Sequence, residues 1–203
     1  MLYIFLNPKK KINNLILKMI ETHEITFKVF YPENKDELLD CDIKDSENSI
    51  ALSILSKVIF PKSFLSNFKN SYNIHPGTKN YPGFGYNFAL LNNEIEYGAV
   101  CHHMEEEIDS GDIILESNFL IHETESVDTL QFKTYLHILI IFNDFIDNYI
   151  SKKLDNLKKV QWSRKPYLKE EFIQMAEKIE DDNLKEKFTR YPDKETPLVE
   201  RYF

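Results

Sequence analysis

The chain has 203 residues, a length that suits one domain with a sizeable core. Its 42% hydrophobic and 13% aromatic content excludes a disordered composition, and no apolar stretch approaches the roughly 20 residues of a membrane-spanning helix. A formal net charge of −8 argues against a nucleic-acid-binding protein, because such binding depends on accumulated Lys and Arg. We therefore expect a globular protein with neither a nucleic-acid nor a membrane partner.

The amino terminus and the cysteines predict a cytoplasmic protein. The apolar opening, residues 1–6, is short and lacks a preceding basic region, which is typical of a first strand and not of a signal peptide. Cys41 and Cys101 lie far apart and have no CxxC spacing, so they indicate neither a disulfide framework nor a thiolate zinc site.

The first sixty residues alternate between β-prone and helical segments. Residues 2–6 and 26–31 are β-prone, residues 13–21 carry apolar side chains at helical spacing, and residues 49–60 form a third β-prone run before Pro61. This alternation predicts an α/β fold with a Rossmann-like, doubly wound, mostly parallel sheet covered by helices.

The pattern changes at residues 73–85, where two prolines and three glycines predict a loop and exclude a helix or a central strand. Further strands are predicted at residues 99–103 and 113–120, a long amphipathic helix at 126–149, and a short helix at 170–179. We expect residues 1–159 to form the catalytic domain and residues 160–203 a short C-terminal extension that contributes to the acceptor site.

Three polar residues around this loop suit acyl transfer. Asn73 and His75 are separated by one residue, so in an extended segment their side chains point to the same side. The Asn amide can stabilise an oxyanion, and the His can donate to it or move a proton. Asp109, in the turn at residues 108–112, is placed to orient the imidazole or to take up the amine proton.

Each motif also has a purely structural explanation. Asn, Pro and Gly are turn formers, and the turn at residues 109–112 is an ordinary β-turn sequence. His102 and His103 suggest metal ligands, but adjacent strand residues point to opposite faces, and the glutamates at 105–107 are typical of a solvated surface. We expect no metal site.

Several motifs in order resemble the core of the folate-dependent formyltransferase family. They are Asn-x-His-Pro-Gly at 73–77, Tyr-Pro-Gly at 81–83, and the segments 88–93, 97–104 and 108–114, preceded by a strand and turn at 58–65. The resemblance covers about residues 49–120 and implies the formyltransferase fold. It also implies that Asn73, His75 and Asp109 are the catalytic residues.

The resemblance implies 10-formyltetrahydrofolate as the formyl donor, so a reduced folate is an expected partner. The residues that correspond to the pterin site are Ile59, Phe60, Met104, Glu105 and Ile108. Simple core packing remains an alternative explanation for the apolar members of this set.

Three acceptors are usual in the family: glycinamide ribonucleotide, methionyl-tRNA and nucleotide-linked amino sugars. The purine-pathway enzyme has a Gly-rich phosphate loop after its first strand, whereas here residues 7–13 contain no glycine. The tRNA enzyme carries an additional basic domain, for which this acidic chain has no room. We therefore expect a nucleotide-linked amino sugar.

Aromatic and basic residues supply candidate contacts to this acceptor, since aromatic rings stack on bases and Arg binds diphosphates. The tail resembles the C-terminal stretches of sugar N-formyltransferases. The candidate substrate-binding residues are Lys79, Tyr81, Tyr86, Trp162, Arg164 and Arg190. A surface turn and a packed tail remain the alternative for each of them.

Two other functions stay open at this stage. One is glycinamide ribonucleotide formyltransferase, and the other is a catalytically inactive folate- or nucleotide-binding module on the same fold. Hydrolysis of the formyl donor would need water in place of the amine. The base, the sugar and the oligomeric state, a homodimer included, are not determined by the sequence.

Overall fold

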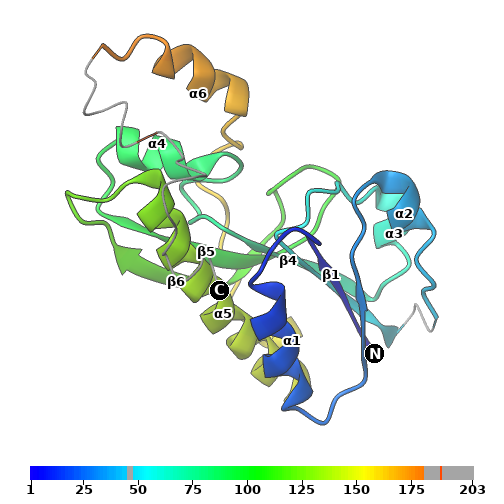
Figure 1. Ribbon diagram of the computed structural model, residues 1–203. Helices are drawn as coiled ribbons and strands as arrows, with labels where there is room; N and C mark the ends of the chain where they lie inside the picture. Colours follow the sequence, from blue (N-terminus) through cyan, green and yellow to red (C-terminus); the bar gives the residue numbers. More distant parts are fainter. Residues whose placement is uncertain (45–47, 181–187, 189–203) are drawn as a thin grey trace.

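The computed structural model describes residues 1–44, 48–180 and 188 of the chain, and these residues form a mixed sheet covered by helices (Figure 1). The strand order is β2-β1-β3-β4-β5-β6. β1 pairs in parallel with β2 and β3, and β3 with β4, whereas β4–β5 and β5–β6 are antiparallel. The strands are β1 (Leu2–Leu6), β2 (Phe27–Phe30), β3 (Ile50–Ile54), β4 (Asn70–His75), β5 (Glu96–His103) and β6 (Ile113–Leu120).

The burial of each strand follows its place in the sheet. All five residues of β1 are buried, as expected for an apolar strand with helices on both faces. β6 lies at the edge, and from Leu115 onward its residues alternate between partly buried and exposed. The expectation of a mostly parallel α/β sheet is thus confirmed, with an antiparallel edge at β5 and β6.

Helices cover both faces of the sheet (Figure 1). α1 (Asn13–Glu21) and α5 (Val127–Ile150) pack on one face in the largest apolar cluster. On the opposite face, α2 (Lys35–Leu39) and α3 (Lys62–Leu65) contribute Leu38 and Phe64 to a second cluster around Tyr3 and Phe5. The remaining helices are α4 (Gly85–Leu91), the 3₁₀ helix η2 (Leu154–Asn156) and α6 (Lys169–Ala176).

The longest helix begins at a defined cap. Ser126 precedes α5, and its hydroxyl accepts a hydrogen bond from Thr129 N, while Thr129 Oγ1 accepts one from Ser126 N. Two of the backbone donors that every helix start leaves without a helical partner are thereby satisfied. No described helix combines the length and the apolar character needed to span a membrane.

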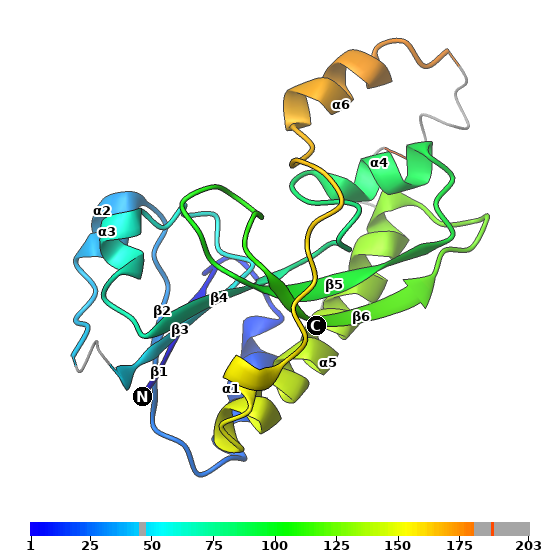
Figure 2. The ribbon, with the colours of Figure 1, turned by 180° about the vertical axis from the view of Figure 1, so that it is seen from behind.

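After η2 the chain returns across the sheet toward α4, as Figure 2 shows from behind. Val160 forms an isolated bridge with Ile113, and Tyr167 forms another with Gly83. Between them Ser163 N donates to Lys79 O at 3.0 Å. The segment 160–167 therefore connects the start of β6 with the loop that follows β4.

Several expected elements have the observed bounds, namely residues 2–6, 13–21 and 113–120. The expectation that residues 73–85 form a loop throughout is wrong at both ends. Asn73–His75 complete β4, because Pro76 and Gly77 follow the strand and do not interrupt it, and Gly85 begins α4. The β-prone run 49–60 is also too long, since β3 ends at Ile54 and Leu55 takes a left-handed φ of 54° that turns the chain.

Candidate active site

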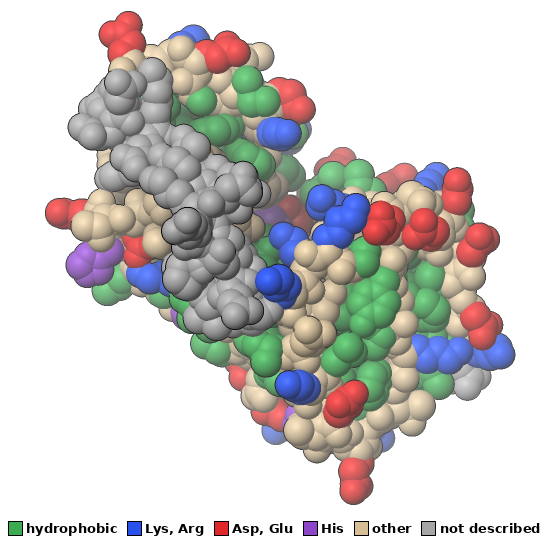
Figure 3. Space-filling view, in the orientation of Figure 1, with side chains coloured by type: hydrophobic (Ala, Val, Ile, Leu, Met, Phe, Trp, Pro, Cys, Tyr) green, Lys and Arg blue, Asp and Glu red, His purple; other side chains and the backbone are tan. Residues whose placement is uncertain are grey.

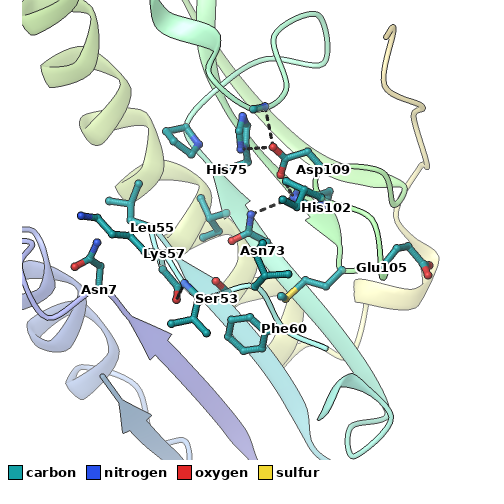
Figure 4. Close-up of a pocket in the computed structure, with 18 of the residues that line it drawn as sticks. Asn7, Ser53, Leu55, Lys57, Phe60, Asn73, His75, His102, Glu105 and Asp109 are labelled. Carbon is teal, nitrogen blue, oxygen red and sulfur yellow. Dashed lines mark hydrogen bonds and ion pairs between the residues drawn. The ribbon is translucent and has the colours of Figure 1, made fainter. Parts of the chain in front are cut away.

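A cavity of about 410 Å³ opens at the edge of the sheet where β1, β3 and β4 end (Figure 4). This is the edge at which open α/β sheets bind ligands. Figure 3 shows a hollow between two parts of the surface, with Lys and Arg side chains beside it. The cavity has the size of a small-molecule site.

The central strand β4 places Asn73 and His75 on the cavity wall. Ile74, between them, points to the apolar cluster on the other side, as the alternation of a strand requires. β4 lies between β3 and β5, so its backbone is held on both sides, and Asn73 is paired with Ser53 and His102. The expected convergence of the Asn and His side chains on one space is observed.

Asp109 reaches the same wall from the loop between β5 and β6. It has a left-handed φ of 46°, which Asp tolerates better than most residues. Its Oδ2 lies 3.1 Å from His75 Nδ1 and accepts a hydrogen bond from Gly83 N at 2.8 Å. Its Oδ1 lies 3.4 Å from His102 Nε2.

These contacts fix the charge of the carboxyl group. Burial alone raises the pKa of Asp109, but the charge of His75 and the hydrogen bonds from His102 and His75 outweigh it, so its pKa lies well below the ordinary value. Asp109 is therefore a carboxylate at neutral pH. Because a carboxylate only accepts, the Nδ1 atom of His75 that faces it carries a proton.

His102 is a further residue of the site, which sequence reasoning considered only as a metal ligand. It is 2% exposed, and its Nδ1 donates to His103 O at 2.7 Å. Its Nε2 lies 3.2 Å from Asn73 Nδ2, across the antiparallel register that pairs the two residues. His103 packs instead on Tyr72, with ring centroids 4.7 Å apart. The pairing of β4 with β5 sets this contact, and the local sequence carries no signal for it.

Two glycines permit the close approach of these groups. A Cβ on Gly77 would lie 2.7 Å from His75 Nε2 and 2.6 Å from Tyr81 O. A Cβ on Gly111 would lie 2.2 Å from His103 O. Any side chain at either position would push the His75 ring or the Asp109 loop away from its place.

The five residues expected at the folate all line the cavity: Ile59, Phe60, Met104, Glu105 and Ile108. Phe60 also belongs to the apolar core, where it packs on Phe5, so the packing explanation holds for it as well. By contrast, 61% of Ile59 and 52% of Ile108 are exposed. Exposed large apolar side chains at a cavity mouth are typical of a ligand site.

Trp162 lies behind the two histidines. Its ring is edge-on to His75 at 5.5 Å and to His102 at 5.1 Å between centroids, and its Nε1 donates to Gly111 O at 2.9 Å. It does not line the cavity. Trp162 thus supports the histidines and the Asp109 loop, and its expected contact with the substrate stays a prediction.

The other expected acceptor residues are placed differently. Tyr86 lines the cavity, whereas Lys79 and the exposed Arg164, which lies over the ring of Tyr167, do not. Tyr81 is 3% exposed in an aromatic cluster, and its hydroxyl donates to Glu94, so the packing explanation accounts for it, and its contact with the acceptor stays a prediction. Arg190 lies outside the described residues.

The described residues contain no group of three His, Cys, Asp or Glu side chains arranged to hold a metal ion. Around Asn73 the cavity wall offers the hydrogen-bonding side chains of Asn73, His75 and His102 and the buried carboxylate of Asp109.

The fold resembles solved sugar N-formyltransferases. A 4-N formyltransferase from Francisella tularensis is 20% identical, with 94% of this chain and 89% of that chain covered and a TM-score of 0.71. A formyltransferase from Anoxybacillus kamchatkensis, solved with a formamido UDP-sugar and tetrahydrofolate, is 17% identical, with coverages of 92% and 95% and a TM-score of 0.68. An N-formyltransferase from Helicobacter canadensis, solved with folinic acid and dTDP-3-aminofucose, is 20% identical, with coverages of 80% and 67% and a TM-score of 0.62.

At these identities the likeness is one of fold, and no curated protein matches the sequence significantly. The sequence model of the formyl transferase family, however, matches residues 10–137, more than half of the chain. The matched region includes β3, β4 and β5, together with the cavity wall formed by Asn73, His75, His102 and Asp109. The chain therefore belongs to the formyl transferase family.

Proposed function

We propose that the protein transfers the formyl group of 10-formyltetrahydrofolate to the amino group of a nucleotide-linked amino sugar. The observation that carries this proposal is the meeting of Asn73, His75 and Asp109 on one cavity in a chain of the formyl transferase family. Solved proteins of the same fold contain a folate together with a nucleotide-linked amino sugar or formamido sugar, which supports the choice of donor and acceptor.

In the proposed reaction the unprotonated amine attacks the formyl carbon. Asn73 and His75 donate hydrogen bonds to the formyl oxygen as it gains negative charge. The new C–N bond replaces the bond between the formyl carbon and the folate nitrogen. That nitrogen gains one proton, and the amine loses one, so the protein keeps no net proton.

Asp109 has a narrower role than a general base. Because its pKa lies well below the ordinary value, it is a weak acceptor for the proton of the amine. We assign it instead to holding His75, whose Nδ1 faces Asp109 Oδ2 at 3.1 Å. A carboxylate fixed beside the imidazole keeps the ring in place and stabilises positive charge that develops on it as the oxyanion forms.

The donor fits the apolar part of the wall. Ile59, Phe60, Met104 and Ile108 offer a surface on which a flat ring system can pack. Glu105, on the same wall, can accept hydrogen bonds from the amino groups of a pterin.

The proposal is tested by incubating the protein with 10-formyltetrahydrofolate and a panel of nucleotide-linked amino sugars, with glycinamide ribonucleotide included. Mass spectrometry should detect the gain of one formyl group by an amino sugar, and Asn73→Ala should abolish it. Formylation of glycinamide ribonucleotide alone would refute the sugar acceptor. Binding of folate without any formyl transfer would indicate an inactive module, and donor breakdown without acceptor would indicate a hydrolase.

A further inference from the structure

Asn7, the residue that follows β1, carries a buried amide nitrogen with no partner among the described residues. The residue is 3% exposed and lines the cavity. Its side-chain oxygen accepts from Lys9 N at 3.1 Å, and its backbone oxygen accepts from Asn13 Nδ2 at 2.8 Å. The Nδ2 atom, by contrast, has no hydrogen-bond partner. Buried donors are almost always satisfied, so this nitrogen requires an explanation.

Lys57 lies beside this amide. It follows β3, it is exposed, and it lines the same cavity. Figure 4 shows Lys57 on the side of the pocket where Asn7 lies, with Glu105 on the opposite side. No hydrogen bond or ion pair within the described part of the chain holds its ammonium group. Lys10, from the same loop as Asn7, also lines the cavity, with its Nζ 5.4 Å from the ring of Tyr135.

This end of the cavity thus presents donors. The Asn7 amide nitrogen and the Lys57 ammonium group offer hydrogen atoms, and an acceptor, best a negatively charged one, can satisfy both. The opposite wall is apolar and carries Glu105, which repels an anion. The two ends of the cavity therefore suit different substrates of a two-substrate reaction: the donor-rich end suits an anionic group, and the apolar end suits a ring system.

We infer that Asn7 and Lys57 bind a phosphate group of the acceptor, with Asn7 Nδ2 as the directional donor and Lys57 as the mobile charge. The inference rests on the proposed function for the identity of the acceptor, a diphosphate-linked sugar. Residues 7–13 contain no Gly-rich phosphate loop. Asn7 and Lys57 would take its place, with side chains and not backbone N–H groups as the donors. Binding an anion would satisfy the Asn7 amide.

The test measures the binding of inorganic pyrophosphate by isothermal titration calorimetry, at low salt, to the full chain and to three variants. Asn7→Asp keeps the oxygen that Lys9 N needs but replaces the amide donor, and Lys57→Met removes the charge at similar length. Lys9→Met is the matched control, because Lys9 is on the same loop but pairs with Glu33 at 3.3 Å and does not line the cavity. We expect each of the first two variants to weaken binding by about tenfold or more, which corresponds to about 1.4 kcal/mol, and the control by less than about twofold.

Equal affinity in all four proteins would overturn the inference, as would the absence of saturable binding to the unaltered chain. A loss of folate affinity in Asn7→Asp, with pyrophosphate binding unchanged, would also overturn it, since the anion would then belong to the donor. Pyrophosphate binding needs no formyl acceptor, so failure of the proposed sugar acceptor would leave this result standing. Circular dichroism of Asn7→Asp checks its fold, and Lys57→Met, altered at an exposed residue, tests the site independently.

Discussion

Asp109 gathers His75, His102 and the Gly83 amide around one carboxylate. Its two oxygens contact different histidines, so it sets the spacing between them. The strained φ of 46° and the close approach at Gly111 show that the loop is held in place by its surroundings. A site of this kind depends on the carboxylate as a geometric centre as well as on its charge.

We expect Asp109→Asn to lower kcat/KM by about two orders of magnitude or more, because the neutral amide no longer stabilises positive charge that develops on His75 during the reaction. Asp112→Asn is the matched control. It lies in the same turn but pairs with Lys159 at 3.6 Å and does not line the cavity, so its kcat/KM should change only a few-fold. Steady-state kinetics of the two variants measure kcat/KM for each of them. Equal losses in Asp109→Asn and Asp112→Asn would contradict a special role for Asp109.

The pKa of Asp109 also predicts a dependence of stability on pH. Its pKa in the folded chain lies well below the ordinary value of about 3.9 for Asp, so below about pH 4 the unfolded chain binds a proton at this residue that the folded chain does not. The stabilisation is present above that pH and is lost as the pH falls through the folded pKa. The difference in unfolding free energy between the unaltered protein and Asp109→Asn should therefore shrink below about pH 4, by at most about 1.4 kcal/mol per pH unit. Urea unfolding of both proteins at pH 7, 4 and 3 measures this difference in free energy. A difference that stays constant with pH would contradict the lowered pKa of Asp109.

His102 should act by positioning Asn73. Its Nδ1 donates to His103 O, and its Nε2 lies 3.2 Å from Asn73 Nδ2 and 3.4 Å from Asp109 Oδ1. We expect His102→Phe to lower kcat by about tenfold or more with little change in the KM for folate, and to alter the pH profile of kcat. His103→Phe is the control, since His103 packs on Tyr72 outside the site. Similar kinetics for both variants would mean that His102 only fills space.

At the level of the elements, the sheet brings together residues from distant parts of the sequence. β4 supplies Asn73 and His75, β5 supplies His102, and the loop before β6 supplies Asp109. The antiparallel pairing of β4 and β5 places Asn73 directly opposite His102. A local motif thus becomes a site only because the chain reverses direction after β4.

The sequence predicts the elements with a local apolar pattern, but not the contacts that depend on strand pairing. β1 and β6 and the helices α1 and α5 have clear apolar patterns, and their expected bounds agree with the structure to within one residue. β4 was missed because Asn70 and Ser71 have weak strand preference, and pairing on both sides overrides that preference. His102 was missed as a site residue because the β4–β5 register is a tertiary property. The burial of Tyr81 could not be predicted either, because the aromatic cluster that buries it comes from several separate segments.

Ser126 allows the contribution of the α5 cap to stability to be measured. Its hydroxyl and that of Thr129 close the start of α5, the helix that covers one face of the sheet. We expect Ser126→Ala to lower the free energy of unfolding by about 1 kcal/mol. Ser151→Ala, at the other end of the same helix, should cost less, because the Ser151 hydroxyl donates to Asp147 O, a carbonyl group that water can also reach. Thermal or urea unfolding compares the two, and an equal cost would argue against the cap.

Over the whole molecule, the segment after η2 acts as a brace across the site. Its contacts reach both the loop after β4, through Ser163 and Tyr167, and the loop before β6, through Trp162. The loop after β4 carries Gly83, whose N–H donates to Asp109, and the loop before β6 carries Asp109 itself. The segment 160–167 thus lies directly behind the two histidines.

The contacts of Trp162 predict that its replacement affects catalysis. Its Nε1 donates to Gly111 O at 2.9 Å, and its ring lies edge-on to both His75 and His102, so it limits the movement of three parts of the site at once. Trp162→Leu keeps apolar bulk but loses the donor and the ring edge. Since a catalytic group displaced by a fraction of an ångström loses much of its effect, we expect kcat to fall by about tenfold or more, with a smaller change in stability.

Lys165→Ala is the matched control for this variant, because Lys165 is exposed on the same segment and does not line the cavity. Its kcat should stay within about twofold of the unaltered value, as is usual for a surface substitution away from the site. Kinetics measured beside unfolding curves distinguish a brace from a packing residue: a brace lowers kcat in the folded protein, whereas a packing residue lowers stability and leaves the kcat of the folded fraction intact. Trp162 is also the single tryptophan of the chain, so its fluorescence reports on the site during folate titration. An unchanged kcat in Trp162→Leu would show that the loops hold the histidines without this segment.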